Sequence, residues 1–430
     1  MKQWIYLLTL LALLLLPARS SVEAIDSGEW SYTLLDDGSA KITAYSGPDA
    51  NVVIPGSLDG HPVSVIGESV FYESSLTSVV IPEGVAVIGD YAFADCKNLT
   101  NVIFPESLIY IAEGAFSGAG LTNVAFPNHL KVIDESAFSS TKLTAVDIPE
   151  GVISIGNYAF FWCESLVSVS LPRSLTSIGE NPFANCRLLA TVQVSADHPA
   201  LEVVDGILFD KNEHRLITAT ASFSTDSYRI PDGVTAIDNY AFYKRTSPRD
   251  LYMPDSVTAI GIYAFSDCAH LSSVTLSNNL RSIPTAAFVG TLLTTIVIPE
   301  GVTTIGGYAF SKCYDLTDVT LPKSLVFIDV GAFLDTSLSS LALPSSVTFI
   351  GVWAFAGTDI STLVIPEGVT TIEEYAFAAC KYLTYVTLPE SLVYIGENAF
   401  GTTPLTRYYV VPDSYAETWV ANNDLPYIYS

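Results

Sequence analysis

Six cysteines recur in one short phrase of the sequence, and cysteines at a regular spacing can form disulfides or hold a metal ion. The phrase reads AFADC, AFFWC, PFANC, AFSDC, AFSKC or AFAAC, and its cysteines are Cys96, Cys163, Cys186, Cys268, Cys313 and Cys380. A zinc site needs Cys or His ligands gathered at short spacing, which no phrase supplies. We therefore expect no metal site and no cofactor.

The cysteine phrase belongs to a longer repeat that is marked by phenylalanine. Successive phenylalanines of the phrase are 22 or 23 residues apart, with one interruption, and they are Phe71, Phe93, Phe116, Phe138, Phe160, Phe183, Phe242, Phe265, Phe288, Phe310, Phe333, Phe355, Phe377 and Phe400. A fixed period of this size is typical of a solenoid, in which single coils cannot fold alone. The sequence therefore predicts a curved stack of about 14 coils.

One repeat unit, residues 76–93, shows how a coil is expected to fold. It reads LTSVVIPEGVAVIGDYAF, and its early part alternates so that Leu76, Val79 and Ile81 face inward. Pro82 lacks an amide donor and ends this strand. Val85 and Ile88 predict a second extended stretch, and the YAFADCKNL segment that follows predicts a turn or a short helical piece.

The residue after the second isoleucine is usually glycine, as at Gly89. A left-handed backbone is the common reason for such a glycine. Pro284, however, stands in the same column, and proline fixes φ near −65°. We therefore interpret these glycines as sites of close approach or tolerance, not as left-handed turns.

The repeat also indicates what the cysteines do. Repeats that carry a thiol are mostly followed by a 23-residue step, so the cysteine belongs to a longer loop in which it packs as a small hydrophobic residue. Coils stack about 4.8 Å apart, so cysteines two coils apart lie beyond disulfide reach. Only Cys163 and Cys186 fall in adjacent coils. A disulfide between them stays open as an alternative to two reduced thiols.

Segments outside the frame predict a leader and two caps. The apolar run IYLLTLLALLLLP after Lys2 is typical of a cleaved signal peptide, with cleavage expected after Ala24. WSYTLLDDGSAKITAYSG predicts a hairpin over the first coil, and GILFDKNEHRLITAT predicts a hairpin inserted between coils. Ser414 and Glu417 form a capping box that opens a terminal helix. The predicted domains are 1–24 signal peptide, 25–60 hairpin cap, 61–194 first solenoid part, 195–230 hairpin insertion, 231–411 second solenoid part and 412–430 cap.

These motifs carry a family resemblance. The unit L-x-x-V-x-I-P-x-x-V-x-x-I-G-x-x-A-F resembles the BspA-like, or treponemal-type, leucine-rich repeats over nearly all of the mature chain, as do VDGILFDK and SYAETWVANNDLPYI. Ser195 and Ser277 replace the strand-closing proline, and YKRTSPRDLYMP is an irregular loop. The resemblance implies an α/β, β-rich superhelix on an exported bacterial surface protein. Some relatives act as adhesins, and no catalytic motif comes with the family.

Charge and motif content exclude several kinds of function. The formal net charge of −26 disfavours nucleic acid and anionic membrane surfaces as partners, and after signal cleavage we expect no membrane insertion. The five histidines are scattered, the carboxylate pairs Asp36–Asp37 and Glu373–Glu374 are interpreted as solvated turns, and neither a phosphate loop nor a nucleophile elbow occurs. We predict that the protein is not an enzyme.

Outward positions of the coils suggest where a partner could bind. The residue before the second isoleucine is aromatic in four coils, at Tyr110, Phe327, Phe349 and Tyr394. Exposed aromatics can form a binding surface. The alternative is that they pack beside the aromatic that precedes Ala-Phe in a neighbouring coil: Tyr308, Trp353 or Tyr375.

Two functional hypotheses follow. The first is a secreted or cell-surface interaction protein that binds a protein or glycan, such as host matrix or another cell, through its solenoid face. The second is a spacer of the cell envelope that supplies rigid length without a specific ligand. If the protein binds a partner, binding should be saturable and should be lost on mutation of one surface patch. If the protein is a spacer, its function should be indifferent to such mutations but sensitive to deletion of coils.

Overall fold

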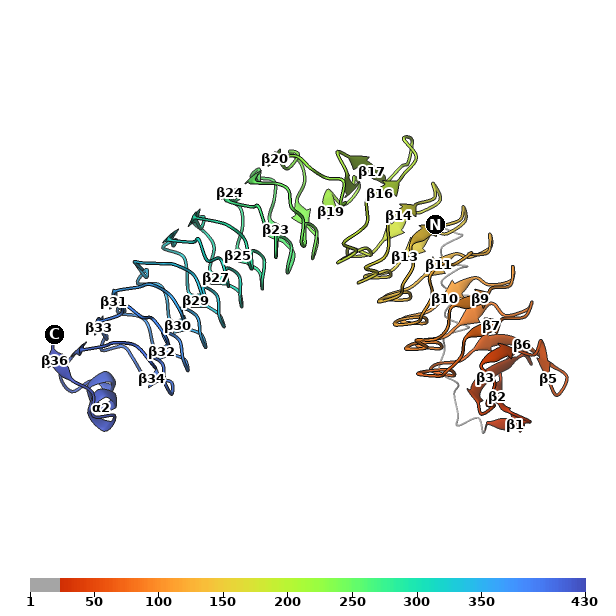
Figure 1. Ribbon diagram of the computed structural model, residues 1–430, viewed down its shortest axis with the longest axis horizontal. Coiled ribbons are helices and arrows are strands. Elements are labelled where there is room, and N and C mark those ends of the chain that lie inside the picture. Colours follow the sequence, from red (N-terminus) through yellow and green to blue (C-terminus); the bar gives the residue numbers. More distant parts are fainter. Residues whose placement is uncertain (1–23) are drawn as a thin grey trace. The chain divides into compact units, whose positions relative to one another are not determined.

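Short strands stacked in parallel make up most of the protein. The computed structural model describes residues 24–430, so the predicted signal peptide lies outside the described residues apart from Ala24. The chain divides into two compact units, the first ending at Val203 and the second beginning at Val204. Each unit is a stack of coils, drawn from red to yellow-green and from green to blue in Figure 1.

The first unit builds two parallel ladders from the two strands of each coil. The first strands form the sheets β4-β7-β9 and β12-β14-β16, and the second strands form the ladder β6-β8-β10-β11-β13-β15. Their bounds are β4 Asn51–Val53, β6 His61–Ile66, β7 Ser78–Val80, β8 Val87–Ile88, β9 Asn101–Ile103, β10 Tyr110–Ile111, β11 Val132–Ile133, β12 Ala145–Asp147, β13 Ser154–Ile155, β14 Ser168–Ser170, β15 Ser177–Ile178 and β16 Thr191–Gln193. Equivalent residues are paired, as in Ile111 with Ile133.

The first unit begins with a small antiparallel sheet. Strands β1 (Ile25–Ser27), β2 (Trp30–Leu34) and β3 (Ala40–Tyr45) pair in order, and β3 then pairs in parallel with β6. The turn of this hairpin is held by Asp37, whose Oδ1 accepts hydrogen bonds from the Ser39 amide and hydroxyl groups. The short strand β5 (Ser57–Leu58) pairs with β6. This sheet supplies hydrogen-bond partners to one end of the second-strand ladder, which would otherwise be an open edge.

The second unit repeats the same construction. Its first strands form β20-β22-β24, β26-β28 and β31-β33-β35-β36, and its second strands form β21-β23 and β25-β27-β29-β30-β32-β34. The bounds are β20 Ser227–Arg229, β21 Ala236–Ile237, β22 Asp250–Tyr252, β23 Ala259–Ile260, β24 Ser273–Thr275, β25 Ser282–Ile283, β26 Thr295–Val297, β27 Thr304–Ile305, β28 Asp318–Thr320, β29 Phe327–Ile328, β30 Phe349–Ile350, β31 Thr362–Val364, β32 Thr371–Ile372, β33 Tyr385–Thr387, β34 Tyr394–Ile395, β35 Arg407–Val410 and β36 Tyr427–Tyr429. Strand β17 (Leu201–Val204) contains the division between the units.

A hairpin and a helix occupy the two ends of the second unit. Strands β18 (Ile207–Asp210) and β19 (Arg215–Ala219) are antiparallel, and β19 also pairs in parallel with β21. Helix α2 (Tyr415–Asn422) is capped by Ser414, whose hydroxyl accepts from the Glu417 amide, while the Glu417 carboxylate accepts from the Asp413 amide. Among the described residues α2 is the only helix, so the turn after each Ala-Phe is not helical and the fold is β-rich with almost no helix.

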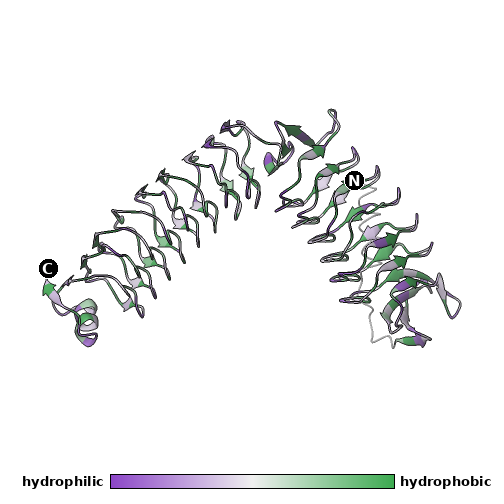
Figure 2. Ribbon diagram, in the orientation of Figure 1, coloured by the Kyte–Doolittle hydropathy of each residue, from purple (hydrophilic) through white to green (hydrophobic). Residues whose placement is uncertain are grey.

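The predicted phenylalanine column is the core of each unit. The rings are buried and stacked, with centroids 4.9 Å apart for Phe71–Phe93 and 5.6 Å apart for Phe377–Phe400. This spacing matches the separation of neighbouring strands in a sheet, so one ring per coil forms a continuous stack. Hydrophobic segments accordingly recur in coil after coil in Figure 2.

Close approach explains the glycines after the second isoleucine. Gly261 is not left-handed, and a Cβ added to it would lie 2.2 Å from the Asn239 amide nitrogen of the preceding coil. Gly156 is similar, with the Glu135 amide nitrogen 2.3 Å away. Close packing of successive backbones, and not a left-handed turn, is therefore what these glycines permit.

The left-handed residues lie instead in the turn on either side of Ala-Phe. In the coil of Phe93 they are Tyr91 (φ 54°) and Asp95 (φ 55°), and nearly every coil repeats both positions. Residues with a Cβ rarely adopt this conformation, which costs them roughly 1–2 kcal/mol. The parallel stacking of the turns imposes it regardless of residue type.

Adjacent alanines of one turn test this imposed conformation. Ala379 is left-handed (φ 56°) and exposed, whereas Ala378 is not left-handed. We expect Ala379→Gly to raise the free energy of unfolding by about 0.5–1 kcal/mol, because glycine has no Cβ penalty there. Ala378→Gly should instead lower it by a similar amount, because glycine only adds freedom to the unfolded chain. Urea titrations followed by circular dichroism measure both, and equal signs would contradict the explanation.

Candidate functional site

The four aromatic residues predicted as a binding surface lie in different surroundings. Tyr110, in the first unit, is only 6% exposed and packs in a side cluster with Val65, Val87 and Ala112. Its hydroxyl donates to the Asp134 carboxylate. Tyr110 therefore does not lie on an open surface, because residues of the cap and the neighbouring coils cover it.

The other three predicted residues lie on the second-strand ladder of the second unit. Phe327 and Phe349 are half-buried and stack on each other with centroids 4.4 Å apart. Tyr394, two coils beyond Phe349 in the same ladder, is 41% exposed. The phenylalanine pair thus packs on itself, while Trp353 lies beside Tyr375 and Tyr308 lies beside Gly331. A binding role for Phe327, Phe349 and Tyr394 stays a prediction.

The cysteines line the inside of the turns. Each thiol donates to the carbonyl group of the phenylalanine one coil earlier, as Cys313 does to Phe288. Burial raises the pKa of the Cys313 thiol to about 11 and that of Cys268 to about 12, so both stay protonated at neutral pH. Threonine takes the same position in other coils, and Thr291 hydrogen-bonds with Cys313. The cysteines are therefore buried hydrogen-bond donors of the stack.

The adjacent pair Cys163 and Cys186 is no exception in this structure. Both thiols are buried and no disulfide joins them. Each donates to a phenylalanine carbonyl, that of Phe138 or Phe160. Oxidation of this pair to a disulfide stays a prediction.

One turn of the first unit departs from the repeat by placing a large exposed aromatic side chain at its second left-handed position. Where other coils carry Asp95, Ser140 or Asp267, the AFFWC turn places Trp162, which is left-handed (φ 58°) and 47% exposed. Its ring lies edge-to-face against Phe161 at 5.7 Å, and Phe161 lies edge-to-face against Tyr158 at 5.7 Å. We call Tyr158, Phe161 and Trp162 the aromatic turn.

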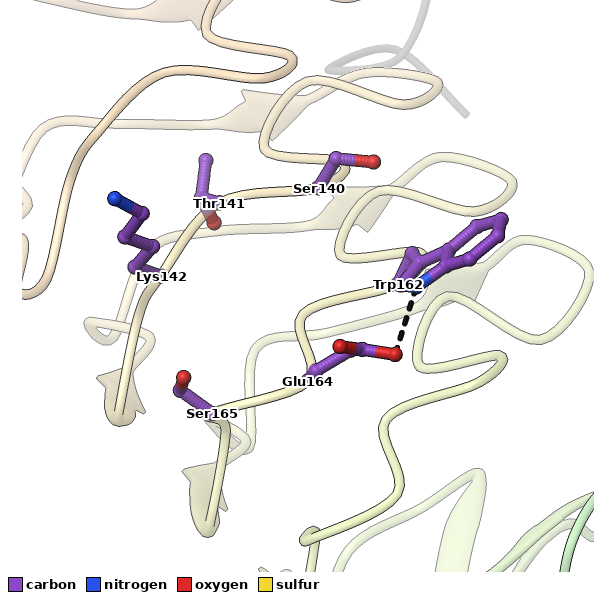
Figure 3. Close-up of a pocket in the computed structure, with 6 residues that line it drawn as sticks. All are labelled: Ser140, Thr141, Lys142, Trp162, Glu164 and Ser165. Atoms are coloured by element: carbon purple, nitrogen blue, oxygen red, sulfur yellow. Dashed lines mark hydrogen bonds between the residues drawn. The ribbon is translucent and has the colours of Figure 1, made fainter. Parts of the chain in front are cut away.

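A hollow lies beside the aromatic turn, between two successive coils. Figure 3 shows its lining, which is Ser140, Thr141, Lys142, Trp162, Glu164 and Ser165. The first three come from one turn and the last three from the next, so stacking of the coils creates the hollow. Its volume of about 440 Å³ is in the range of small-ligand sites.

The carboxylate group of Glu164 contacts both Trp162 and Arg187 at this hollow. The indole Nε1–H of Trp162 donates to Glu164 Oε1 at 2.9 Å, and the Arg187 guanidinium reaches the same oxygen at 3.0 Å. Both Glu164 and Arg187 are partly exposed, so the ion pair contributes little to stability. Its main effect is to fix the orientation of the indole ring.

The part of the chain that the structure describes offers neither a cluster of metal ligands nor a helix that could span a membrane. Within residues 24–430, no group of three or more His, Cys, Asp or Glu side chains is placed to hold a metal ion. Over the same residues no helix has the length and apolarity to cross a bilayer. The aromatic turn with its hollow is the candidate site, because it joins an exposed, oriented indole to a polar concavity.

Sequence reasoning missed this site although its signal was visible. The phrase AFFWC places two aromatics where AFADC and AFSDC have a small and an acidic residue. The cysteine dominates the interpretation of this phrase, and exposed aromatics are predicted only before the second isoleucine. The sequence does not reveal the left-handed backbone that turns position 162 outward.

Stacked coils with parallel ladders and a buried phenylalanine column define a leucine-rich-repeat solenoid. The family model described as the BspA type leucine rich repeat region matches six copies over residues 64–190, 220–336 and 308–417. The chain belongs to this BspA-type leucine-rich repeat family, as its repeat unit indicated.

Solved structures of bacterial leucine-rich-repeat proteins are similar. A leucine rich cell surface protein from Faecalibacterium prausnitzii is 28% identical with a TM-score of 0.59, over 75% of this chain and 97% of that one. A leucine-rich repeat protein from Eubacterium ventriosum is 23% identical (TM-score 0.57, 79% and 96% covered), and the pneumococcal vaccine antigen PcpA is 17% identical (TM-score 0.54, 95% and 98% covered). The last two show the fold alone. No curated protein sequence matches this chain.

Proposed function

We propose that this chain is an exported, non-enzymatic interaction protein of the bacterial cell surface that binds a protein or a glycan through the outer surface of its coils. The observation that carries the proposal is the aromatic turn. Trp162 is large, exposed and held in one orientation, at a position where the repeat otherwise has small or polar residues. Rigid exposed aromatics are typical anchors of binding surfaces.

The cellular location is part of the proposal. The predicted leader at residues 1–24 supports export, and the protein from Faecalibacterium prausnitzii with 28% identity is called a cell surface protein. Fractionation of the native bacterium with an antibody against the mature chain tests this location. Recovery of the chain only in the cytoplasm would contradict it.

A binding assay separates an interaction protein from a spacer. The mature chain is screened against immobilised host-matrix proteins and a glycan array, and bacteria that express it are tested for attachment to host cells. We expect saturable binding that Trp162→Ala weakens at least about tenfold, while Trp353→Ala, a second exposed tryptophan in the other unit, leaves it unchanged. Attachment that is indifferent to both variants but lost on deletion of one coil would support the spacer.

A further inference from the structure

We propose that the hollow beside Trp162 is a binding site for a neutral saccharide, with one face of a sugar ring stacked on the indole and its hydroxyl groups bonded to the surrounding polar side chains. This inference rests on the proposed function and names the ligand class of the same site. The occupant is identified by what the hollow offers: one rigid aromatic face and several polar groups without a protein partner.

The face of the Trp162 indole is exposed, and its orientation is fixed before a ligand binds. Trp162 keeps its orientation through the bond to Glu164 and the edge-to-face contact with Phe161, and nearly half of its surface remains exposed. In Figure 3 the indole projects from its turn beside the other lining residues. A ring fixed before binding loses little conformational freedom when a ligand stacks on it.

The polar groups around this face suit hydroxyl-rich ligands. Among the described residues, the hydroxyl groups of Ser140 and Ser165 and the ammonium group of Lys142 have no hydrogen-bond or ion-pair partner in the protein. Glu164 uses Oε1 for both Trp162 and Arg187, so Oε2 is left to accept a further bond. Sugar hydroxyls can donate to a carboxylate and a serine and accept from an ammonium group.

Size and charge favour a neutral saccharide over a protein or an acidic sugar. A hollow of about 440 Å³ with a single aromatic ring suits one or two sugar units, whereas a stable protein interface needs about 800 Å² from each partner. An acidic sugar would bring its charge beside Glu164, on a chain whose net charge is −26. Lys142 is the one cation of the lining, so the hollow has no excess of positive charge.

The test uses neutral oligosaccharides and the native tryptophan signal. The mature chain is applied to an array of neutral hexose and N-acetylhexosamine oligosaccharides, with sialylated and uronate-containing members for comparison. Neutral members that bind are then titrated in solution while tryptophan emission is recorded. We expect a dissociation constant below about 10 mM, an emission change that Trp162→Ala abolishes, and at least about tenfold weaker binding in that variant.

Two further variants keep the outcome interpretable. Trp353→Ala should keep wild-type affinity, and Glu164→Gln should weaken binding several-fold, because the amide still accepts from the indole but bonds a hydroxyl less strongly. Circular dichroism establishes that each variant is folded. The inference is overturned if no neutral member binds below about 10 mM, or if Trp162→Ala binds as tightly as wild type. A protein partner lost in Trp162→Ala, without saccharide binding, would also overturn it while leaving the proposed function standing.

Discussion

Replacing Phe310 with alanine should lower the free energy of unfolding of the second unit by about 3–5 kcal/mol. The Phe310 ring is fully buried and lies 5.5 Å from Phe288 and 5.3 Å from Phe333, centroid to centroid. Alanine would leave a cavity that closely spaced neighbouring coils cannot fill by moving together. Each coil contacts mainly its neighbours, so the weakened coil interrupts the stack on both sides.

Phe327→Ala provides the matched control. Phe327 is also stacked on a phenylalanine, Phe349 at 4.4 Å, but it is half-buried on the outer side of the ladder. Its loss should cost about 1–2 kcal/mol, because less surface returns to water. Urea unfolding followed by circular dichroism, with hydrogen exchange to locate the opened coils, measures both variants. Equal costs for the two would mean that the buried column is not the main core.

Replacing Arg215 with alanine is expected to destabilise the start of the second unit by about 3 kcal/mol. Arg215 is 13% exposed and donates to Asp238 Oδ2 at 2.8 Å, with the Asp210 carboxylate 3.8 Å away. Asp238 and Asp210 are 4% and 7% exposed, so the variant removes the positive charge that Arg215 places beside two buried carboxylates. Asp210 also accepts bonds from the Asn212 and Glu213 amides and so holds the β18–β19 turn.

An exposed arginine of the same unit tests whether burial is the cause. Arg229 pairs with Asp232 at 3.0 Å, but both side chains are more than half exposed, so Arg229→Ala should cost less than about 1 kcal/mol. Thermal unfolding of both variants and hydrogen exchange of β19 measure these effects. Equal losses of stability in the two variants would refute burial as the cause.

The repeat made most of the fold predictable from the sequence. A column of phenylalanines at a fixed period can only be buried if the coils stack in register, and Pro82 and its equivalents limit the length of the first strand. Pro284 occupies the position that is usually glycine after the second isoleucine. This single residue was enough to indicate that the glycines at this position permit close approach of the coils and not a left-handed turn. These inferences work because each coil repeats the same local environment.

Features that depend on one particular coil could not be predicted in this way. The burial of Tyr110 depends on neighbours supplied by the N-terminal cap, among them Leu35. The bond from Arg215 to Asp238 joins residues 23 positions apart, and it forms only because β19 takes the place of a second strand next to β21. Trp162 was overlooked because a tryptophan is an unexpected occupant of a left-handed turn.

The paired left-handed positions of each turn have a consequence for how this molecule can change. Their backbone is held by hydrogen bonds to the next coil, such as that from the Asp95 amide to the Ser117 carbonyl group, and these bonds involve no side chain. Aspartate, lysine, glycine, alanine and tryptophan all occupy the second position, so the scaffold accepts almost any side chain there. Substitutions at these turns can therefore change the outer surface of the protein coil by coil, without any compensating change in its interior.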